Sequence, residues 1–296
     1  MTLTRRTLLK SAAAGAAATV ALRADARERR MLPPNAQGLL YDSTLCIGCR
    51  ACVVKCKLAN GLPPDTKMVD GVAYDAPEGL NATTKTVVQQ VSLADRSAFM
   101  KRQCMQCVDP ACVSACMIKA FQKDPQTGVI SYEASRCLGD RYCQMACPFN
   151  VPKFEWSKAF PVMVKCELCR KRVDRTDRDG VPACAEVCPR EAVISGKTTD
   201  LLAVARARQK AHPGRYEERI FGEKEAGGTQ CLYLAPKGVS FEELGMPKVP
   251  DHSIPEMAVS LQHGIYYDGI APIVGFIGLG IIVSRNRAKA EKGETK

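Results

Sequence analysis

Apolar residues are concentrated in one uninterrupted stretch near the carboxyl end, from Ile270 to Val283. Extended back to Ile265, the stretch covers about 19 residues, and a bilayer-spanning helix needs roughly 17–25. Tyrosines precede the stretch and basic residues follow it, which is the order found at the two surfaces of a membrane. The pattern predicts a transmembrane anchor at residues 263–285 and a basic cytoplasmic tail at 286–296. A buried core helix is the alternative.

A second apolar stretch, Ser11–Leu22, is rich in alanine and lies near the amino end. Arg5 and Arg6 precede it, and the small residues of a small-x-small sequence follow at 24–26. This order of charge, apolar run and cleavage site is typical of a twin-arginine signal peptide. We therefore expect residues 1–26 to direct export, so that the mature protein lies at the periplasmic face of the bacterial inner membrane. A basic arm before an alanine-rich helix is the alternative.

Short segments between these stretches have the periodicity of strands and helices. Lys85–Leu93 and Gln230–Ala235 predict strands, and Asp200–Gln209 predicts a helix. The expected fold class is therefore α+β. The expected segments after the signal peptide are a linker at 27–40, a cysteine-rich domain at 41–200, an extension at 201–262 that packs on or flanks this domain, the anchor and the tail.

The cysteine content shows that a large aromatic core does not hold the chain together. The 296 residues include 16 cysteines, while only 6% are aromatic. All but one of the cysteines fall into four groups. The groups are group 1 with Cys46, Cys49, Cys52 and Cys56; group 2 with Cys104, Cys107, Cys112 and Cys116; group 3 with Cys137, Cys143 and Cys147; and group 4 with Cys166, Cys169, Cys184 and Cys188. This repetition predicts a series of similar metal sites.

The spacing within the groups favours 4Fe-4S clusters. Three closely spaced cysteines can bind three irons of one cube, and the fourth, expected where the chain enters a helix, reaches a neighbouring cluster. A zinc-binding structural protein is an alternative, but zinc sites do not need the third close cysteine or the crossed fourth ligand. Disulfides are disfavoured because such closely spaced cysteines have poor pairing geometry. Cys231 stands outside the groups, in a predicted strand, and we expect it to be buried without a role.

The charge of the chain limits its partners. The net charge is +11, of which the signal peptide contributes +3, so the mature chain remains basic. Such a surface suits binding to nucleic acid, anionic lipid or an acidic partner. No nucleic-acid-binding motif accompanies it, so we expect membrane lipid, and not nucleic acid, as a binding partner. The chain has 3 histidines and no phosphate-binding loop. We therefore expect a non-catalytic subunit whose partners carry out catalysis.

Six stretches match a known family of proteins. They are Leu40–Cys46, Lys101–Asp109, Lys123–Pro125, Cys147–Lys153, Lys165–Cys169 and Gly222–Glu225. They resemble the four-cluster electron-transfer subunits of respiratory oxidoreductases, and within them the iron-sulfur subunit of membrane-bound NiFe hydrogenase of the hydrogenase-2 type. The resemblance implies two bacterial-ferredoxin-like modules with loop insertions in the four-cluster domain at 41–200, each module holding two 4Fe-4S clusters.

The resemblance also implies a function and partners. Electrons would pass through four iron-sulfur clusters between a periplasmic NiFe hydrogenase, with its small and large subunits, and an integral membrane quinone-reactive subunit. An electron-transfer subunit of a molybdenum oxidoreductase or of a cytochrome complex is the alternative.

In this family group 1 exchanges its last cysteine with group 4, and group 2 exchanges its last cysteine with group 3. The implied ligand sets are set I with Cys46, Cys49, Cys52 and Cys188; set II with Cys56, Cys166, Cys169 and Cys184; set III with Cys104, Cys107, Cys112 and Cys147; and set IV with Cys116, Cys137 and Cys143. Set IV is one cysteine short, because Asp140 stands where the family has a cysteine. A carboxylate is a harder donor than a thiolate, so set IV is predicted to hold either a 4Fe-4S cluster with Asp140 as a ligand or a 3Fe-4S cluster.

Overall fold

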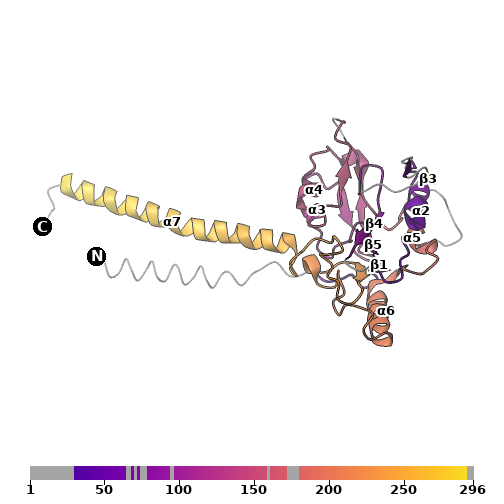
Figure 1. Ribbon diagram of the computed structural model, residues 1–296. Helices are drawn as coiled ribbons and strands as arrows, with labels where there is room; N and C mark the ends of the chain where they lie inside the picture. Colours follow the sequence, from indigo (N-terminus) through magenta and orange to yellow (C-terminus); the bar gives the residue numbers. More distant parts are fainter. Residues whose placement is uncertain are drawn as a thin grey trace. The chain divides into compact units, whose positions relative to one another are not determined.

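The computed structural model describes residues 30–64, 68–69, 72–73, 79–93, 97–158, 161–171 and 180–291. Within this part of the chain, the side chains of 68–69, 72–73, 259–272, 274 and 289–291 are not described. The signal peptide expected at 1–26 lies outside the described residues. Arg30–Pro255 forms one compact unit, and helix α7 (Ile254–Glu291) belongs almost entirely to a second unit (Figure 1).

A three-stranded sheet in the order β10–β1–β11 runs through the compact unit. Strand β1 (Gln37–Asp42) pairs antiparallel with β10 (Val193–Lys197) and parallel with β11 (Cys231–Leu234). In this register Leu40 lies between Ile194 and Leu232. Strands drawn from three distant parts of the sequence therefore meet in one sheet.

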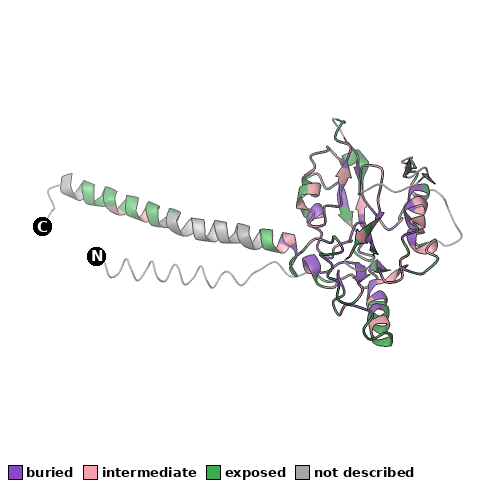
Figure 2. Cartoon of the chain, viewed as in Figure 1, coloured by how far each residue is buried: buried purple, intermediate pink, exposed green. Residues whose placement is uncertain are grey.

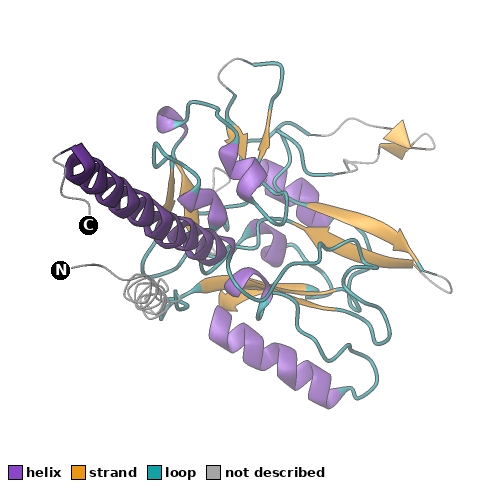
Figure 3. Cartoon of the chain, turned by 90° about the vertical axis from the view of Figure 1, so that its left-hand side faces the viewer, coloured by secondary structure: helices purple, strands orange, loops and turns teal. Residues whose placement is uncertain are grey.

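Alternate residues of β1 face opposite sides of the sheet, as the period of two in a strand requires. Leu40 packs against Leu201 and Ala205 of helix α6 (Thr198–Ala211), which lies alongside the sheet (Figure 3). Leu39 and Tyr41 pack on the other side, in the large apolar cluster that contains cysteines of the four groups. Because both faces are covered, β1 is an almost continuous run of buried residues (Figure 2).

Four short hairpins and several short helices surround this sheet. The hairpins are β2 (Met68–Val69) with β3 (Val72–Ala73), β4 (Val87–Ser92) with β5 (Ser97–Arg102), β6 (Phe121–Lys123) with β7 (Ile130–Tyr132), and β8 (Lys153–Phe154) with β9 (Met163–Val164). The helices are α2 (Ala51–Ala59), α3 (Ala111–Ser114), α4 (Tyr142–Ala146) and α5 (Ala183–Glu186), with 3₁₀ turns at η2 (Ala134–Arg136) and η3 (Glu225–Gly227). The mixed helix and strand content expected from the sequence is confirmed.

The predicted elements match the structure well, but two expected segment boundaries do not. The expected strands correspond to β4 and β11, and the expected helix corresponds to α6. Residues 37–40 were assigned to a linker, yet they belong to the buried strand β1. The expected boundary at residue 200 falls inside α6, and β11 hydrogen-bonds directly to β1. The extension is thus part of the same compact unit, because β1 needs α6 and β11 to cover its apolar side chains.

Helix α7 is a single helix of 38 residues. Where its side chains are described, several large apolar ones are exposed, among them Ile273, Phe276 and Ile277. None of the helices in the described part of the chain is both long and apolar enough to cross a bilayer.

Asp42 ties the end of β1 to the carboxyl-terminal part of the compact unit. Its buried carboxylate accepts hydrogen bonds from the Arg208 guanidinium at 3.0 Å and the Tyr216 hydroxyl at 2.9 Å. Its other oxygen accepts from the hydroxyl of Thr44 at 2.7 Å. A buried carboxylate is stable only with such partners, so this network holds β1, α6 and the segment after α6 together.

Replacing Asp42 by Ala should therefore destabilise the compact unit. Removing one member of a buried ion pair typically costs about 3–5 kcal/mol of the free energy of unfolding. Pulse proteolysis of the purified protein at increasing urea concentrations measures the change. The matched control is Asp251→Ala, which removes an exposed carboxylate and should change the free energy of unfolding by less than about 0.5 kcal/mol. Equal urea midpoints for the two variants would contradict the role given to Asp42.

Candidate iron-sulfur sites

In each cysteine group a helix contains the last cysteine but one: Cys52 in α2, Cys112 in α3, Cys143 in α4 and Cys184 in α5. The last cysteine of each group follows four residues later. The helix therefore begins earlier than expected, because the chain was predicted to enter it only at the last cysteine. This early start places the last two cysteines of each group about one helical turn apart, so that one helix and the residues directly after it can serve two sites.

The loops share an unusual backbone conformation. The residue two positions after the first cysteine has a positive φ in all four groups: 70° at Gly48, 52° at Gln106, 75° at Gly139 and 51° at Leu168. Glutamine and leucine rarely adopt this conformation. Turns that include a left-handed residue point successive amides toward one anion, as in many iron-sulfur sites. The repeated conformation therefore prepares each loop for a negatively charged group.

Backbone amides also reach the cysteine sulfurs. The amide of Leu168 donates to Cys166 Sγ at 3.4 Å, and the amide of Ala120 donates to Cys116 Sγ at 3.3 Å. Burial raises the pKa of Cys104 to about 11, and the amide of Gln106 opposes part of this rise. Because hydrogen bonds to a charged form favour that form, these amides stabilise thiolates, the form that binds iron.

The side chains of each set implied by the family resemblance lie together. The pKa of Cys52 is raised to about 11, mainly by burial and in part by the other thiols of set I. Burial likewise raises the pKa of Cys56 and of Cys107, and the remaining thiols of set II and set III, respectively, add to the rise. Cys56 and Cys169 of set II even share one donor, because the Asn60 amide approaches both sulfurs, at 3.7 and 4.0 Å.

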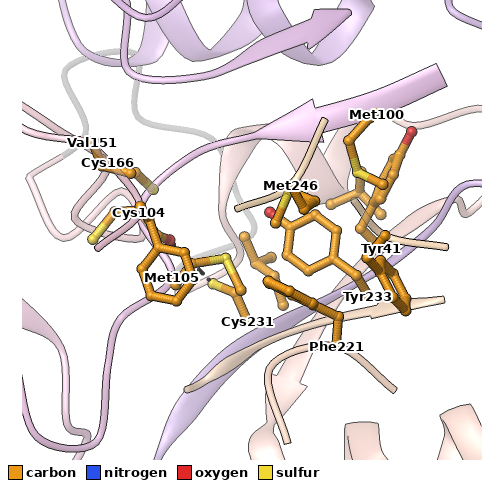
Figure 4. Close-up of a cluster of buried hydrophobic side chains, with 14 of the residues drawn as sticks. Tyr41, Met100, Cys104, Met105, Val151, Cys166, Phe221, Cys231, Tyr233 and Met246 are labelled. Carbon is orange, nitrogen blue, oxygen red and sulfur yellow. Dashed lines mark hydrogen bonds between the residues drawn. The ribbon is translucent and has the colours of Figure 1, made fainter. Parts of the chain in front are cut away.

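Neighbouring thiols connect the four sets in the order I, II, III and IV. Thiols of successive sets are electrostatic neighbours in three pairs: Cys52 with Cys184, Cys104 with Cys166, and Cys112 with Cys143. Figure 4 shows Cys104 and Cys166 close to each other at one side of the large apolar cluster. The pairs connect set I to set II, set II to set III, and set III to set IV, so that sets I and IV are the ends of the series.

Two buried lysines lie beside these sets. Lys101 is 0% exposed, and its ammonium donates to Thr86 Oγ1 and Gln103 Oε1. Burial by itself lowers the pKa of Lys101, but surrounding thiols of sets I and II raise it above its usual value. Lys165 donates to the carbonyl of Ile130 at 2.5 Å and to that of Cys166 at 3.1 Å. Its charge partly offsets the effect of burial on the thiols of set III.

The residues present fit 4Fe-4S clusters. A buried cation is costly unless a negative group compensates it, and the hydrogen-bond acceptors of Lys101 are neutral. Clusters held by thiolates would supply the negative charge for the buried lysines and for the inward-pointing amides. No three His, Cys, Asp or Glu side chains among the described residues are arranged to hold a single metal ion.

Comparison with known proteins agrees with this geometry. A family profile described as a 4Fe-4S dicluster domain matches residues 96–198. The chain is 38% identical to the hydrogenase-2 operon protein HybA of Escherichia coli O157:H7, over 95% of each chain. The chain belongs to the HybA-like family of iron-sulfur electron-transfer subunits. It is 40% identical to a protein of Nitratidesulfovibrio vulgaris, over 88% of this chain and 73% of the relative. It is also 32% identical to the nitrate-inducible formate dehydrogenase iron-sulfur subunit of Escherichia coli K12, over 71% of this chain and 72% of the relative.

Membership of the HybA-like family establishes the chemistry of the cysteine groups. The protein is a non-catalytic electron-transfer subunit of an oxidoreductase complex and carries 4Fe-4S clusters, as expected from the sequence. The alternative of a zinc-binding structural protein is thereby wrong. The matched profile includes groups 2, 3 and 4, and group 1 precedes it.

Set IV differs from the other sets of this HybA-like chain. Burial raises the pKa of Cys143 to about 12, and the neighbouring charge of Asp140 is the next largest cause. Asp140 is exposed and accepts a hydrogen bond from the amide of Tyr142 at 3.3 Å. Arg141 stacks on the ring of Trp156 at 4.3 Å, and among the described ion pairs it has none with Asp140. The carboxylate of Asp140 therefore lies next to the thiols of set IV, and no ion pair of Asp140 is found within the described part of the chain.

Sequence reasoning missed the buried lysines but predicted the burial of Cys231. Lys101 and Lys165 lie inside matched stretches, shortly before the first cysteine of groups 2 and 4, and a lysine within three residues of the first cysteine in both groups was a usable signal. Cys231 is buried as predicted; its thiol donates to the carbonyl of Cys104 at 3.4 Å and accepts from the Gln103 amide at 3.7 Å. These two hydrogen bonds hold the Cys231 side chain in the buried core of the HybA-like chain.

Proposed function

We propose that the protein conducts electrons through four clusters between the small and large subunits of a periplasmic NiFe hydrogenase and an integral membrane quinone-reactive subunit. The observation that carries this proposal is that neighbouring thiols connect the sets in the order I to IV. When bound, each cluster takes up or releases one electron at a potential set by charge, hydrogen bonds and exposure. The chain's own residues hold the clusters in a row and keep the two middle sets away from solvent.

The proposed ligands are the cysteines of the four sets, arranged in two bacterial-ferredoxin-like modules. Helices α2 and α5 pack together, and so do α3 and α4. These pairs carry groups 1 and 4 and groups 2 and 3, respectively, which are the groups that exchange their last cysteine. Sets I and II would form one module, and sets III and IV the other.

The two ends of the series expose apolar side chains beside the sites. Ile47, in the loop of set I, is 57% exposed, and Cys49 next to it is also exposed. Around set IV, Met145 is 85% exposed and Trp156 is 68% exposed. Exposed apolar side chains that gather in one area mark protein contacts. We place the contacts with the partner subunits at these two ends, where electrons would enter and leave.

A formate dehydrogenase or another molybdenum oxidoreductase is the second candidate partner. It is favoured by the 32% identity to the formate dehydrogenase subunit. That match covers 71% of this chain, whereas the match to HybA covers 95%. The higher coverage supports a hydrogenase partner.

Removing one middle ligand tests the proposed route. Cells lacking this chain should lose hydrogen-dependent quinone reduction but keep hydrogen-dependent reduction of a soluble dye by the catalytic subunits. The wild-type chain and the Cys231→Ala control should restore quinone reduction, whereas Cys184→Ala should not, because it removes a ligand of set II. Full quinone reduction with Cys184→Ala would contradict the route, and restoration of formate-dependent reduction alone would favour the second candidate.

We further propose that Asp140 faces the fourth iron of set IV. The support is its position beside Cys143, with no ion pair to Asp140 among the residues that the structure describes. Because a carboxylate binds this iron less firmly than a thiolate, the air-oxidised native protein should show the electron paramagnetic resonance signal of a 3Fe-4S cluster. Asp140→Cys should abolish that signal and retain about one more iron per chain. If the native protein lacks the signal, and Asp140→Ala matches it in iron content and redox titration, then Asp140 is not a ligand.

Residues 263–285 of α7 are proposed as a membrane anchor that follows export by the twin-arginine route. The support is the apolar sequence and the exposed apolar side chains of the described part of α7, of which Phe276 is 74% exposed. In cells without the partner subunits, a chain ending at Gln262 should be found in the periplasmic fraction. The full chain should sediment with membranes, as should a control chain ending at Ala288. Equal sedimentation of the Gln262 chain would show that the anchor lies elsewhere.

A further inference from the structure

Tyr233 carries a buried hydroxyl without a hydrogen-bond partner. Its side chain is 1% exposed, and its oxygen has no partner among the described residues. The ring is held edge-on by Tyr41, at 5.5 Å, and by Phe221, at 6.3 Å. Buried polar groups in native proteins are nearly always hydrogen-bonded. The hydroxyl therefore lies where a group other than the polypeptide can accept a hydrogen bond from it.

The strand β11 directs Tyr233 toward the cysteine sites. Residues two apart on a strand share a face, so Tyr233 lies on the face of Cys231, whose thiol donates to the carbonyl of Cys104. Figure 4 shows the Tyr233 ring between Tyr41 and Met100 on one side and Cys104 and Cys166 on the other. The thiols that influence the hydroxyl, besides Cys231, belong to sets II and III, and two of them are Cys166 and Cys184 of set II.

Lys101 approaches set II from another element, strand β5. Its fully buried ammonium donates only to neutral oxygens in the hydrogen bonds of the structure. The cysteines around it belong to two sets: Cys52 to set I, and Cys56, Cys166 and Cys184 to set II. Set II is therefore the set that Tyr233 and Lys101 have in common.

We propose that the Tyr233 hydroxyl donates a hydrogen bond to the cluster of set II, and that Lys101 places a fixed positive charge beside the same cluster. This inference rests on the ligand sets of the proposed function. One-electron reduction adds one negative charge to the cluster without making or breaking a bond. A hydrogen-bond donor and a cation both stabilise the added charge, so both residues raise the reduction potential of this cluster.

Redox titration of the purified, cluster-loaded protein, followed by electron paramagnetic resonance, tests the proposal independently of turnover. Tyr233→Phe removes one oxygen atom and should lower the reduction equilibrium constant of one step by roughly three- to tenfold. Lys101→Met should lower the reduction equilibrium constants of two steps, those of the clusters of sets I and II. The expected decrease is about tenfold, which is about 59 mV for a one-electron couple. The step that moves in Tyr233→Phe should be one of these two.

Two controls separate this effect from a structural one. Tyr216→Phe removes a hydroxyl that donates to Asp42 at 2.9 Å and should move no step. Lys101→Arg keeps the positive charge and should leave both steps close to their original potentials. Each variant is compared with the wild type at equal iron content.

An unchanged titration in Tyr233→Phe at full iron content would overturn the hydrogen bond while leaving the four-cluster function intact, and would assign the hydroxyl to a buried water. If Tyr233→Phe shifts the reduction potential of a cluster that Lys101→Met leaves unchanged, the assignment to set II is overturned. If Lys101→Met fails to assemble, the Tyr233→Phe titration decides alone. A lowered potential of one cluster supports the proposal, and unchanged potentials of all clusters refute it. Iron for fewer than four clusters in the wild type would instead contradict the proposed function.

Discussion

In the proposed ligand sets, Cys56 and Cys188 each stand in a group whose other members belong to the neighbouring set, so neither set can be completed unless α2 and α5 pack against each other. The same holds for Cys116 and Cys147 with α3 and α4. The proposed crossing of ligands would make cluster binding and folding depend on each other, as in other metal-bound proteins. It would also fix the spacing of successive sites, because about one helical turn separates a thiol of one set from a thiol of the next.

The central sheet gives this arrangement a common support. Strand β1 precedes group 1, β10 follows group 4, and β11 comes from the carboxyl-terminal extension. Leu39 and Tyr41 on one face contribute to the cluster around the cysteines, while Leu40 on the other packs on α6. The extension therefore does more than flank the cysteine-rich region: it completes the core and brings Cys231 and Tyr233 next to the cysteine sites.

Charge is distributed in the interior as the sites require. Apolar burial disfavours thiolates, since it raises the pKa of a thiol. Inward-pointing amides and the ammonium groups of Lys101 and Lys165 act in the opposite direction. An interior that holds cations without carboxylate partners is stable only when negative groups lie beside them. The same residues that make cluster binding favourable are thus in a position to adjust the reduction potentials along the series.

The sequence alone determined the chemistry and the local elements, because both depend on residues close together in the chain. The spacing of group 1 indicated iron-sulfur ligation, and polar–apolar alternation located β4. It did not determine which thiols share a site, and family resemblance had to supply the pairing of groups 1 and 4. Only the tertiary structure decided that residues 37–40 belong to a strand buried on both faces and that Lys101 and Tyr233 are buried near cysteines of distant groups. These features depend on contacts between distant segments, and no local pattern encodes which segments will meet.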